Sequence, residues 1–132
     1  GQVVVVTSIM GKVATPRRAT YAAAKHALHG YFEALRAELF RTDISITLLC
    51  TGYIKTPISL SSVKGSGAAY GTMDDQHRNA MPAEVYARKA LRAIVKRRPV
   101  AYLGGPERFG PMLARLSPAL VRWLLPRIIT RD

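Results

Sequence analysis

The sequence predicts an α/β fold in which parallel strands form a sheet with helices packed against it. Strand-like and helix-like segments alternate in the order strand, helix, strand, loop, helix, strand and tail. Such alternation is typical of right-handed βαβ crossovers, which place successive strands parallel in one sheet. The first strand-like run is also apolar without interruption, as expected for a strand covered on both faces of a parallel sheet.

The first half of the chain contains two predicted strands with a long helix between them. Val3–Val6 is an unbroken β-branched run, and ISITLLC over 44–50 is the second strand. Residues 19–41 carry apolar residues at helical spacing. These are Ala24, Leu28, Tyr31, Phe32, Leu35 and Leu39. Gly30 costs this helix about 1 kcal/mol relative to alanine, and close approach of another backbone is the expected reason.

The second half supplies a loop, a helix and a third strand. Residues 57–80 are mixed in character and rich in glycine, so we expect a long loop, and a loop of that length in a compact domain is usually functional. A helix is predicted to begin at Pro82, and PVAYL over 99–103 reads as a strand. Three strands make a small sheet, and nothing obvious in the chain covers the far side of Val3–Val6. The sequence is therefore expected to be part of a larger fold.

Composition restricts the classes of protein that fit. The chain has 132 residues, of which 48% are hydrophobic, so it is globular and about one domain long. A single cysteine, Cys50, excludes an internal disulfide framework and a cysteine zinc cluster, and we expect it to be a buried thiol. The first residues resemble no signal peptide, and no run of about 18 uncharged apolar residues predicts a membrane-spanning helix.

The net charge of +12 is unevenly distributed. Residues 1–80 contain 9 Lys/Arg against 5 Asp/Glu, whereas residues 81–132 contain 11 against 3. A basic half indicates an anionic partner: a phosphate-bearing cofactor, nucleic acid or an anionic membrane surface. A solvated basic face explains the same charge without a partner. Nucleic acid is the least favoured partner, because the basic residues lack the interleaved aromatics of a stacking platform.

Three groups of polar residues are expected at one edge of the sheet. Ser8 ends the first strand, the turn TGYIKT over 51–56 follows the second, and Tyr21 and Lys25 begin the helix between them. The carboxyl ends of parallel strands form the working edge of such sheets. The spacing of four residues places Tyr21 and Lys25 on one side of the helix.

These side chains suit one kind of chemistry. Tyrosine has a pKa near 10, and a neighbouring ammonium lowers the pKa of a tyrosine by favouring the phenolate. Tyr21 could then exchange a proton with a carbonyl or alcohol oxygen, while Ser8 donates a hydrogen bond to the same oxygen. A hydride would have to come from a cofactor, because no side chain supplies one.

The run VVVVTSIMGKVATPRRATYAAAKHALHGYFEALRAEL resembles the central segment of short-chain dehydrogenases/reductases. The family carries a serine at the end of its fifth strand and Tyr-x-x-x-Lys in the following helix. Ser8 and Tyr21 stand 13 residues apart, which matches the usual spacing in the family. In the next turn Gly52, Ile54 and Thr56 match the family, whereas Thr51 replaces its proline. The resemblance covers roughly residues 1–103.

The resemblance implies a Rossmann-like, doubly wound parallel sheet and roles for individual residues. Tyr21 would be the catalytic acid/base, Lys25 would tune it and bind the nicotinamide ribose, and Ser8 would contact the substrate oxygen. Gly52, Ile54 and Thr56 would bind the cofactor beside Tyr21 and Lys25. The implied activity is NAD(P)-dependent interconversion of a carbonyl and a secondary alcohol, in a homo-oligomer. Separately from the resemblance, we expect NADP to be slightly favoured over NAD and the protein to be cytoplasmic, with membrane association as an open alternative.

The family's glycine-rich turn after its first strand is not found in this sequence. Gly65, Gly67, Gly104 and Gly105 do not stand between a strand and a helix as that turn requires. We therefore expect residues 1–106 to be the last three strands and helices of such a domain, from the carboxyl-terminal half of the enzyme or a truncated chain. An apolar substrate is expected from the apolar content of the predicted loop. Its apolar residues are Ile58, Leu60, Val63, Ala68, Ala69, Tyr70 and Met73.

Residues 107–132 are predicted to form an amphipathic basic tail. Arginines recur every seven residues at Arg108, Arg115 and Arg122, with Trp123 among the apolar residues. Prolines at 111, 118 and 126 are expected to break the tail into short helices. The tail could lie on a membrane surface, cover the substrate site or pack in a subunit interface. A non-catalytic basic module that binds a membrane or a protein is the alternative to an enzyme.

Two other catalytic arrangements are disfavoured. His26 and His29 lie three residues apart, a spacing that metals use, but no third ligand is evident, and no metal is expected. A hydrolase built on Ser8 and His26 would need a G-x-S-x-G turn, which is absent around Ser8.

Overall fold

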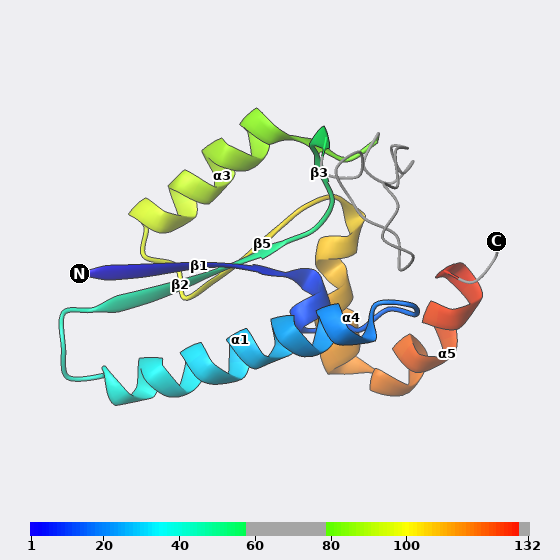
Figure 1. Ribbon diagram of the computed structural model, residues 1–132, viewed down its shortest axis with the longest axis horizontal. Helices are drawn as coiled ribbons and strands as arrows, with labels where there is room; N and C mark the ends of the chain where they lie inside the picture. The colour runs from blue at the N-terminus through cyan, green and yellow to red at the C-terminus, as the bar shows by residue number, and fades with distance from the viewer. Residues whose placement is uncertain (58–78, 130–132) are drawn as a thin grey trace, which may run out of the picture.

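The computed structural model describes residues 1–57 and 79–129. A three-stranded sheet lies between two helices, one on each face (Figure 1). The strands of the sheet are β1 (Gln2–Ser8), β2 (Ser45–Thr51) and β5 (Val100–Leu103). The flanking helices are α1 (Ala19–Glu38) and α3 (Ala83–Val95). The predicted loop over 57–80 lies almost wholly outside the described residues.

The sheet is parallel throughout and has the order β1-β2-β5, with β2 in the centre. Ser8 is the register partner of Thr51, and Thr51 is the register partner of Leu103. The three strands therefore end at one common edge. The predicted α/β fold with a partial parallel sheet of three strands and flanking helices is confirmed.

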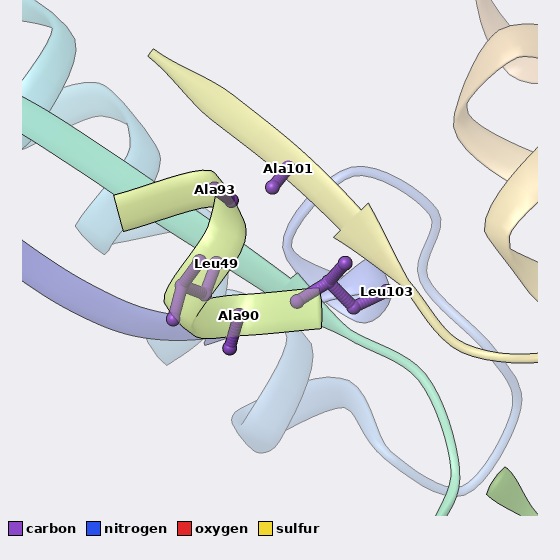
Figure 2. Packing of buried hydrophobic residues seen from close by; sticks show 5 residues of the cluster. All are labelled: Leu49, Ala90, Ala93, Ala101 and Leu103. Carbon is purple, nitrogen blue, oxygen red and sulfur yellow. The ribbon is translucent and has the colours of Figure 1, made fainter. Parts of the chain in front are cut away.

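The α3 face of the sheet holds the main hydrophobic cluster (Figure 2). Two alanines of α3, Ala90 and Ala93, lie against Leu49 of β2 and against β5, and their small side chains let the helix approach closely. Leu49 is 3% exposed, and complete burial of such a side chain stabilises the fold by about 1.5–3 kcal/mol. Gln2 strengthens this face, because its amide nitrogen donates to Thr47 Oγ1 and to the Ile94 carbonyl.

The α1 face is closed by a short 3-10 turn, η1 (Ile9–Gly11), that follows β1. Gly11 is buried against α1, where an added Cβ would stand 2.8 Å from the Lys25 carbonyl oxygen and 2.6 Å from the His29 ring. Only a residue without a side chain permits this approach. Gly30 was the glycine for which a close approach was predicted, and that prediction is wrong, because no atom of another described segment lies within 4 Å of its would-be Cβ.

Burial of Val3–Val6 on both faces is not observed in this chain. Val6 is 58% exposed, and Val3 and Val4 are also exposed. The reason is that β1 is an edge strand whose outer side has no pairing strand within residues 1–57 and 79–129, whereas β2 is flanked on both sides and almost wholly buried.

The chain beyond the sheet forms short helical segments. They are η3 (Pro106–Phe109), α4 (Gly110–Leu116) and α5 (Pro118–Ile129). Pro111 and Pro118 stand in the first turns of α4 and α5, where a missing N–H costs little. The prediction that Pro126 breaks the tail is wrong, since α5 continues through it at the loss of one backbone hydrogen bond. Within the described residues no helix is both long and apolar enough to cross a membrane.

Candidate functional site

Ser8 is the last residue of β1 and lies at the carboxyl edge of the sheet. Its side chain is buried, and its hydroxyl oxygen accepts a hydrogen bond of 3.1 Å from the Met10 backbone N–H. This bond caps η1 and fixes the path of the chain after the strand. The serine is thus held at the position that the sequence predicted, and within residues 1–57 and 79–129 its hydroxyl donates to no acceptor.

Tyr21 and Lys25 lie in the first two turns of α1. The Lys25 ammonium is 5.5 Å from the centre of the Tyr21 ring, within the range of a cation–π contact. Tyr21 is 43% exposed and Lys25 is half-buried, so both polar ends can reach solvent or a ligand. Among the described residues no hydrogen bond joins Ser8 to Tyr21. The two segments meet through η1, because Gly11 packs against the Lys25 backbone.

The turn after β2 is held by both neighbouring strands. Thr51 Oγ1 donates to the Thr7 carbonyl of β1, and Gly52 N–H donates to the Leu103 carbonyl of β5 at 2.7 Å. Since Ser8 and Thr51 are register partners, this turn begins beside the serine. The structure therefore brings Ser8 and the Thr51–Gly52 turn together at one edge.

The remainder of the turn runs toward α3. β3 (Ile54–Lys55) pairs in parallel with β4 (Met81–Pro82), and Pro82 immediately precedes α3. Ile54 and Thr56 are half-buried along this connection. This small second sheet was not predicted, because two-residue strands leave no periodic pattern in a sequence.

Two residues at this edge were also missed by sequence reasoning. The Tyr53 N–H donates to Glu107 Oε1 at 2.9 Å, so a carboxylate from η3 reaches the turn after β2. Tyr86 of α3 lies close to Thr51, and burial raises the pKa of its phenol, partly offset by a side-chain hydrogen bond with Thr51. The one available signal was an acidic residue directly after Gly104-Gly105-Pro106, which by itself indicates no partner.

A buried pair lies behind the site, between α1 and β2. His29 Nε2 is 3.6 Å from Cys50 Sγ, and burial lowers the pKa of His29 to about 4, assisted by the charge of Lys12. Burial likewise raises the pKa of Cys50 to about 11, so the predicted buried thiol is confirmed. The pair is a neutral imidazole beside a neutral thiol at pH 7.

The edge therefore combines an exposed phenol with an ammonium beside it, a buried serine hydroxyl, and a turn that is hydrogen-bonded to β1, to β5 and to Glu107. A phenol and a hydroxyl can both donate hydrogen bonds to one oxygen atom of a ligand. The ammonium adds a positive charge that favours an anionic oxygen nearby. Within the parts of the chain that the structure describes, no three side chains gather as metal ligands.

Comparison with known proteins places this arrangement in context. A family model described as short chain dehydrogenase matches residues 1–66. The chain is 42% identical over 105 residues to Dehydrogenase/reductase SDR family member 7B of Xenopus laevis, covering 80% of this chain and 32% of that protein. It is 31% identical over 128 residues to Dehydrogenase/reductase SDR family protein 7-like of Drosophila melanogaster, covering 96% of this chain and 39% of that protein.

A solved structure has the same arrangement of elements. A short-chain dehydrogenase from Streptomyces avermitilis superposes with a TM-score of 0.60 at 17% identity, covering 99% of this chain and 52% of that one. At this identity the likeness concerns the fold alone. The chain spans about a third of the length of the curated relatives quoted above.

Proposed function

This chain belongs to the short-chain dehydrogenase family, and from that premise we propose that it carries the acid/base and nicotinamide side of an NAD(P)-dependent oxidoreductase that interconverts a carbonyl and a secondary alcohol. Members of the family are typically oxidoreductases that use NAD(P). The observation that carries the proposal is the Lys25 ammonium 5.5 Å from the Tyr21 ring, at the edge where β1 and β2 end.

In this proposal Tyr21 gives its proton to the carbonyl oxygen of the substrate, or takes one from the alcohol. Lys25 stabilises the phenolate that forms and donates hydrogen bonds to the nicotinamide ribose. The Ser8 hydroxyl donates to the same substrate oxygen and stabilises the charge that develops there. The bound cofactor supplies or accepts the hydride.

The residues present fit one end of such a cofactor. The turn that carries Gly52, Ile54 and Thr56 begins beside Ser8, at its register partner Thr51, and would face the nicotinamide through its backbone and the threonine hydroxyl. Lys25 offers three donors that reach solvent. We place the site in residues 1–106, with NADP favoured over NAD, an apolar carbonyl as substrate, and a homo-oligomer as the assembled form.

The test replaces the phenol alone. Tyr21→Phe in the full-length protein removes the transferred proton and should lower kcat by at least about a hundredfold, in the range that general acid–base catalysis contributes. Turnover of a panel of ketones with NADPH and NADH is the measurement. Tyr31→Phe is the matched control, because Tyr31 is an exposed tyrosine of the same helix. Full activity of Tyr21→Phe would contradict the role assigned to it.

For the tail, residues 107–132, we propose peripheral contact with an anionic membrane surface. Leu116, Trp123 and Ile128 are exposed, and the Arg127 guanidinium stands 4.3 Å from the centre of the Trp123 ring. Exposed apolar side chains interspersed with arginines suit the boundary between headgroups and acyl chains. The competing assignment, a non-catalytic basic module, rests on the same surface.

Sedimentation with vesicles measures this contact. Leu116→Ser with Trp123→Ser should reduce binding of the full-length protein to vesicles that contain phosphatidylserine, about fivefold or more on the scale of lost apolar burial. Phe40→Ser is the control: it removes an exposed apolar residue that lies outside the tail and should leave binding to the vesicles unchanged. Equal sedimentation of the wild-type protein, the double variant and Phe40→Ser would contradict the proposed membrane contact.

A further inference from the structure

Glu107 lies in an unusual position for a charged side chain. It belongs to the short turn η3, yet its carboxylate reaches back across the end of the sheet and is half-buried there. Oε1 accepts two hydrogen bonds of 2.9 Å, one from the Tyr53 N–H after β2 and one from the Gly105 N–H after β5. One oxygen atom therefore joins the two turns that leave the sheet.

This oxygen lies just beyond the end of the ladder between β2 and β5, whose last bond is Gly52 N–H to the Leu103 carbonyl. Alternate residues of β2 donate to β5, as Leu48 and Gly52 do, so the N–H of Tyr53 is not the next donor of that ladder. It donates to the Glu107 carboxylate, and pairing a backbone N–H in this way avoids the cost of an unsatisfied donor.

Three glycines make room for the carboxylate. A Cβ on Gly52 would overlap Oε1, a Cβ on Gly104 would stand 2.6 Å from Oε1, and a Cβ on Gly105 would stand 2.8 Å from Oε2. The absence of side chains at Gly104 and Gly105 lets Glu107 pack directly on the backbone of the turn after β2.

From this geometry we propose that Glu107 is a positioning residue that fixes the Gly52–Tyr53 turn in the shape that receives the nicotinamide end of the cofactor. The inference rests on the proposed function, in which Gly52, Ile54 and Thr56 bind that end. Glu107 touches neither cofactor nor substrate. It acts through the backbone, because the N–H that it holds lies between Gly52 and Ile54.

The test distinguishes binding of the nicotinamide end from binding of the rest of the cofactor. Titration of the full-length protein with NADPH and NADH is compared with titration with ADP-ribose and its 2′-phosphate, which lack the nicotinamide. Glu107→Ala should weaken binding of the reduced cofactors about tenfold, equivalent to about 1.4 kcal/mol. Its affinity for the ADP-ribose compounds should remain within about twofold of wild type, since these do not contact the turn.

Two further variants make the test specific. Glu107→Gln keeps a carbonyl oxygen as acceptor and should restore most of the affinity for reduced cofactor, whereas Glu38→Ala, which removes an exposed carboxylate at the end of α1, should change nothing. Gly52→Ala should weaken binding of the reduced cofactors as Glu107→Ala does. In the Glu107→Ala background the same substitution should weaken that binding little further, because the carboxylate that the new Cβ would overlap is then gone. If Glu107→Ala does not fold, Glu107→Asp takes its place in the same titrations, because its shorter side chain withdraws the acceptor from the Tyr53 N–H.

Each outcome has one meaning. Selective weakening for the reduced cofactors, with rescue by glutamine, supports the proposal. Unchanged affinity in Glu107→Ala, or equal loss for both kinds of ligand, overturns it, because the residue would then be dispensable or generally structural. Failure of the wild-type protein to bind any of the four nucleotides would instead overturn the proposed function, on which this inference depends.

Discussion

Helix α1 carries two regions that share one sequence spacing and differ in nearly every physical property. Tyr21, Lys25 and His29 follow one another at intervals of four residues, so they lie along one side of the helix. Tyr21 is 43% exposed, whereas His29 is 4% exposed. Lys25 and Tyr21 form a cation–π contact, whereas His29 lies against the thiol of Cys50.

The cause of the difference is what packs against each turn of the helix. Eight residues of α-helix span about 12 Å, enough to pass from the rim of the sheet to its interior. His29 lies opposite β2 and under Gly11, where water is excluded, whereas Tyr21 lies one turn before the contact between Gly11 and the Lys25 backbone. The same periodicity thus gives an exposed phenol with an ammonium beside it at one end and a buried neutral histidine at the other. Helical spacing alone does not distinguish them.

The largest effect is expected from breaking the exposed pair. Lys25→Met keeps the length and apolar stem of the side chain but removes the ammonium beside Tyr21. We expect kcat to fall at least about a hundredfold, since stabilisation of the phenolate is lost. The melting temperature should change by less than about 2 °C, because the ammonium makes no hydrogen bond with any of the described residues. Carbonyl reduction and thermal unfolding of the full-length protein measure the two quantities.

Lys89→Met is the matched control for this variant, because Lys89 is an exposed lysine of α3 outside the proposed site. It should leave both quantities unchanged. A large loss of stability in Lys25→Met, with activity reduced only in proportion to the folded fraction, would mean that the exposed pair is structural like the buried one. The contrast between the two regions of α1 would then disappear.

Much of the fold could be predicted because its signals are local. The strands over 3–6, 44–50 and 99–103 and the helices beginning near residues 19 and 82 were expected within a few residues of their observed bounds. Apolar runs and helical periodicity identify such elements without tertiary information. The common edge of the strands followed from the parallel order, so the neighbourhood of Ser8 and the 51–56 turn was predictable as well.

The features that could not be predicted depend on contacts between distant segments. Glu107 meets Tyr53 across 54 residues, and no periodic pattern connects a carboxylate with a backbone N–H. The exposure of Val6 depends on which strand lies beside β1, which the β-branched run does not specify. The burial of His29 depends on the glycine at position 11, whose role is visible only once η1 is folded against α1.

A smaller effect, on stability, is expected at His29, the buried residue on this side of α1. Burial lowers the pKa of His29 to about 4, below its ordinary value of 6.5. Between these values the unfolded chain binds a proton that the folded chain does not, so this contribution is complete above about pH 6.5 and is lost as the pH falls toward 4. The free energy of unfolding should therefore be lower at pH 5 than at pH 7 by about 1–2 kcal/mol from this residue.

Denaturant unfolding of the full-length protein at both pH values measures this difference. His29→Gln lacks the titrating group and should reduce the difference between pH 7 and pH 5 by that amount, although the variant itself is less stable at pH 7 because the ring packing is lost. His26→Gln is the control, since His26 is an exposed histidine three residues earlier on the same helix, and it should keep the wild-type difference. If His29→Gln also keeps that difference, protonation of His29 does not oppose folding, and the buried end of α1 is as accessible to water as the end that carries Tyr21.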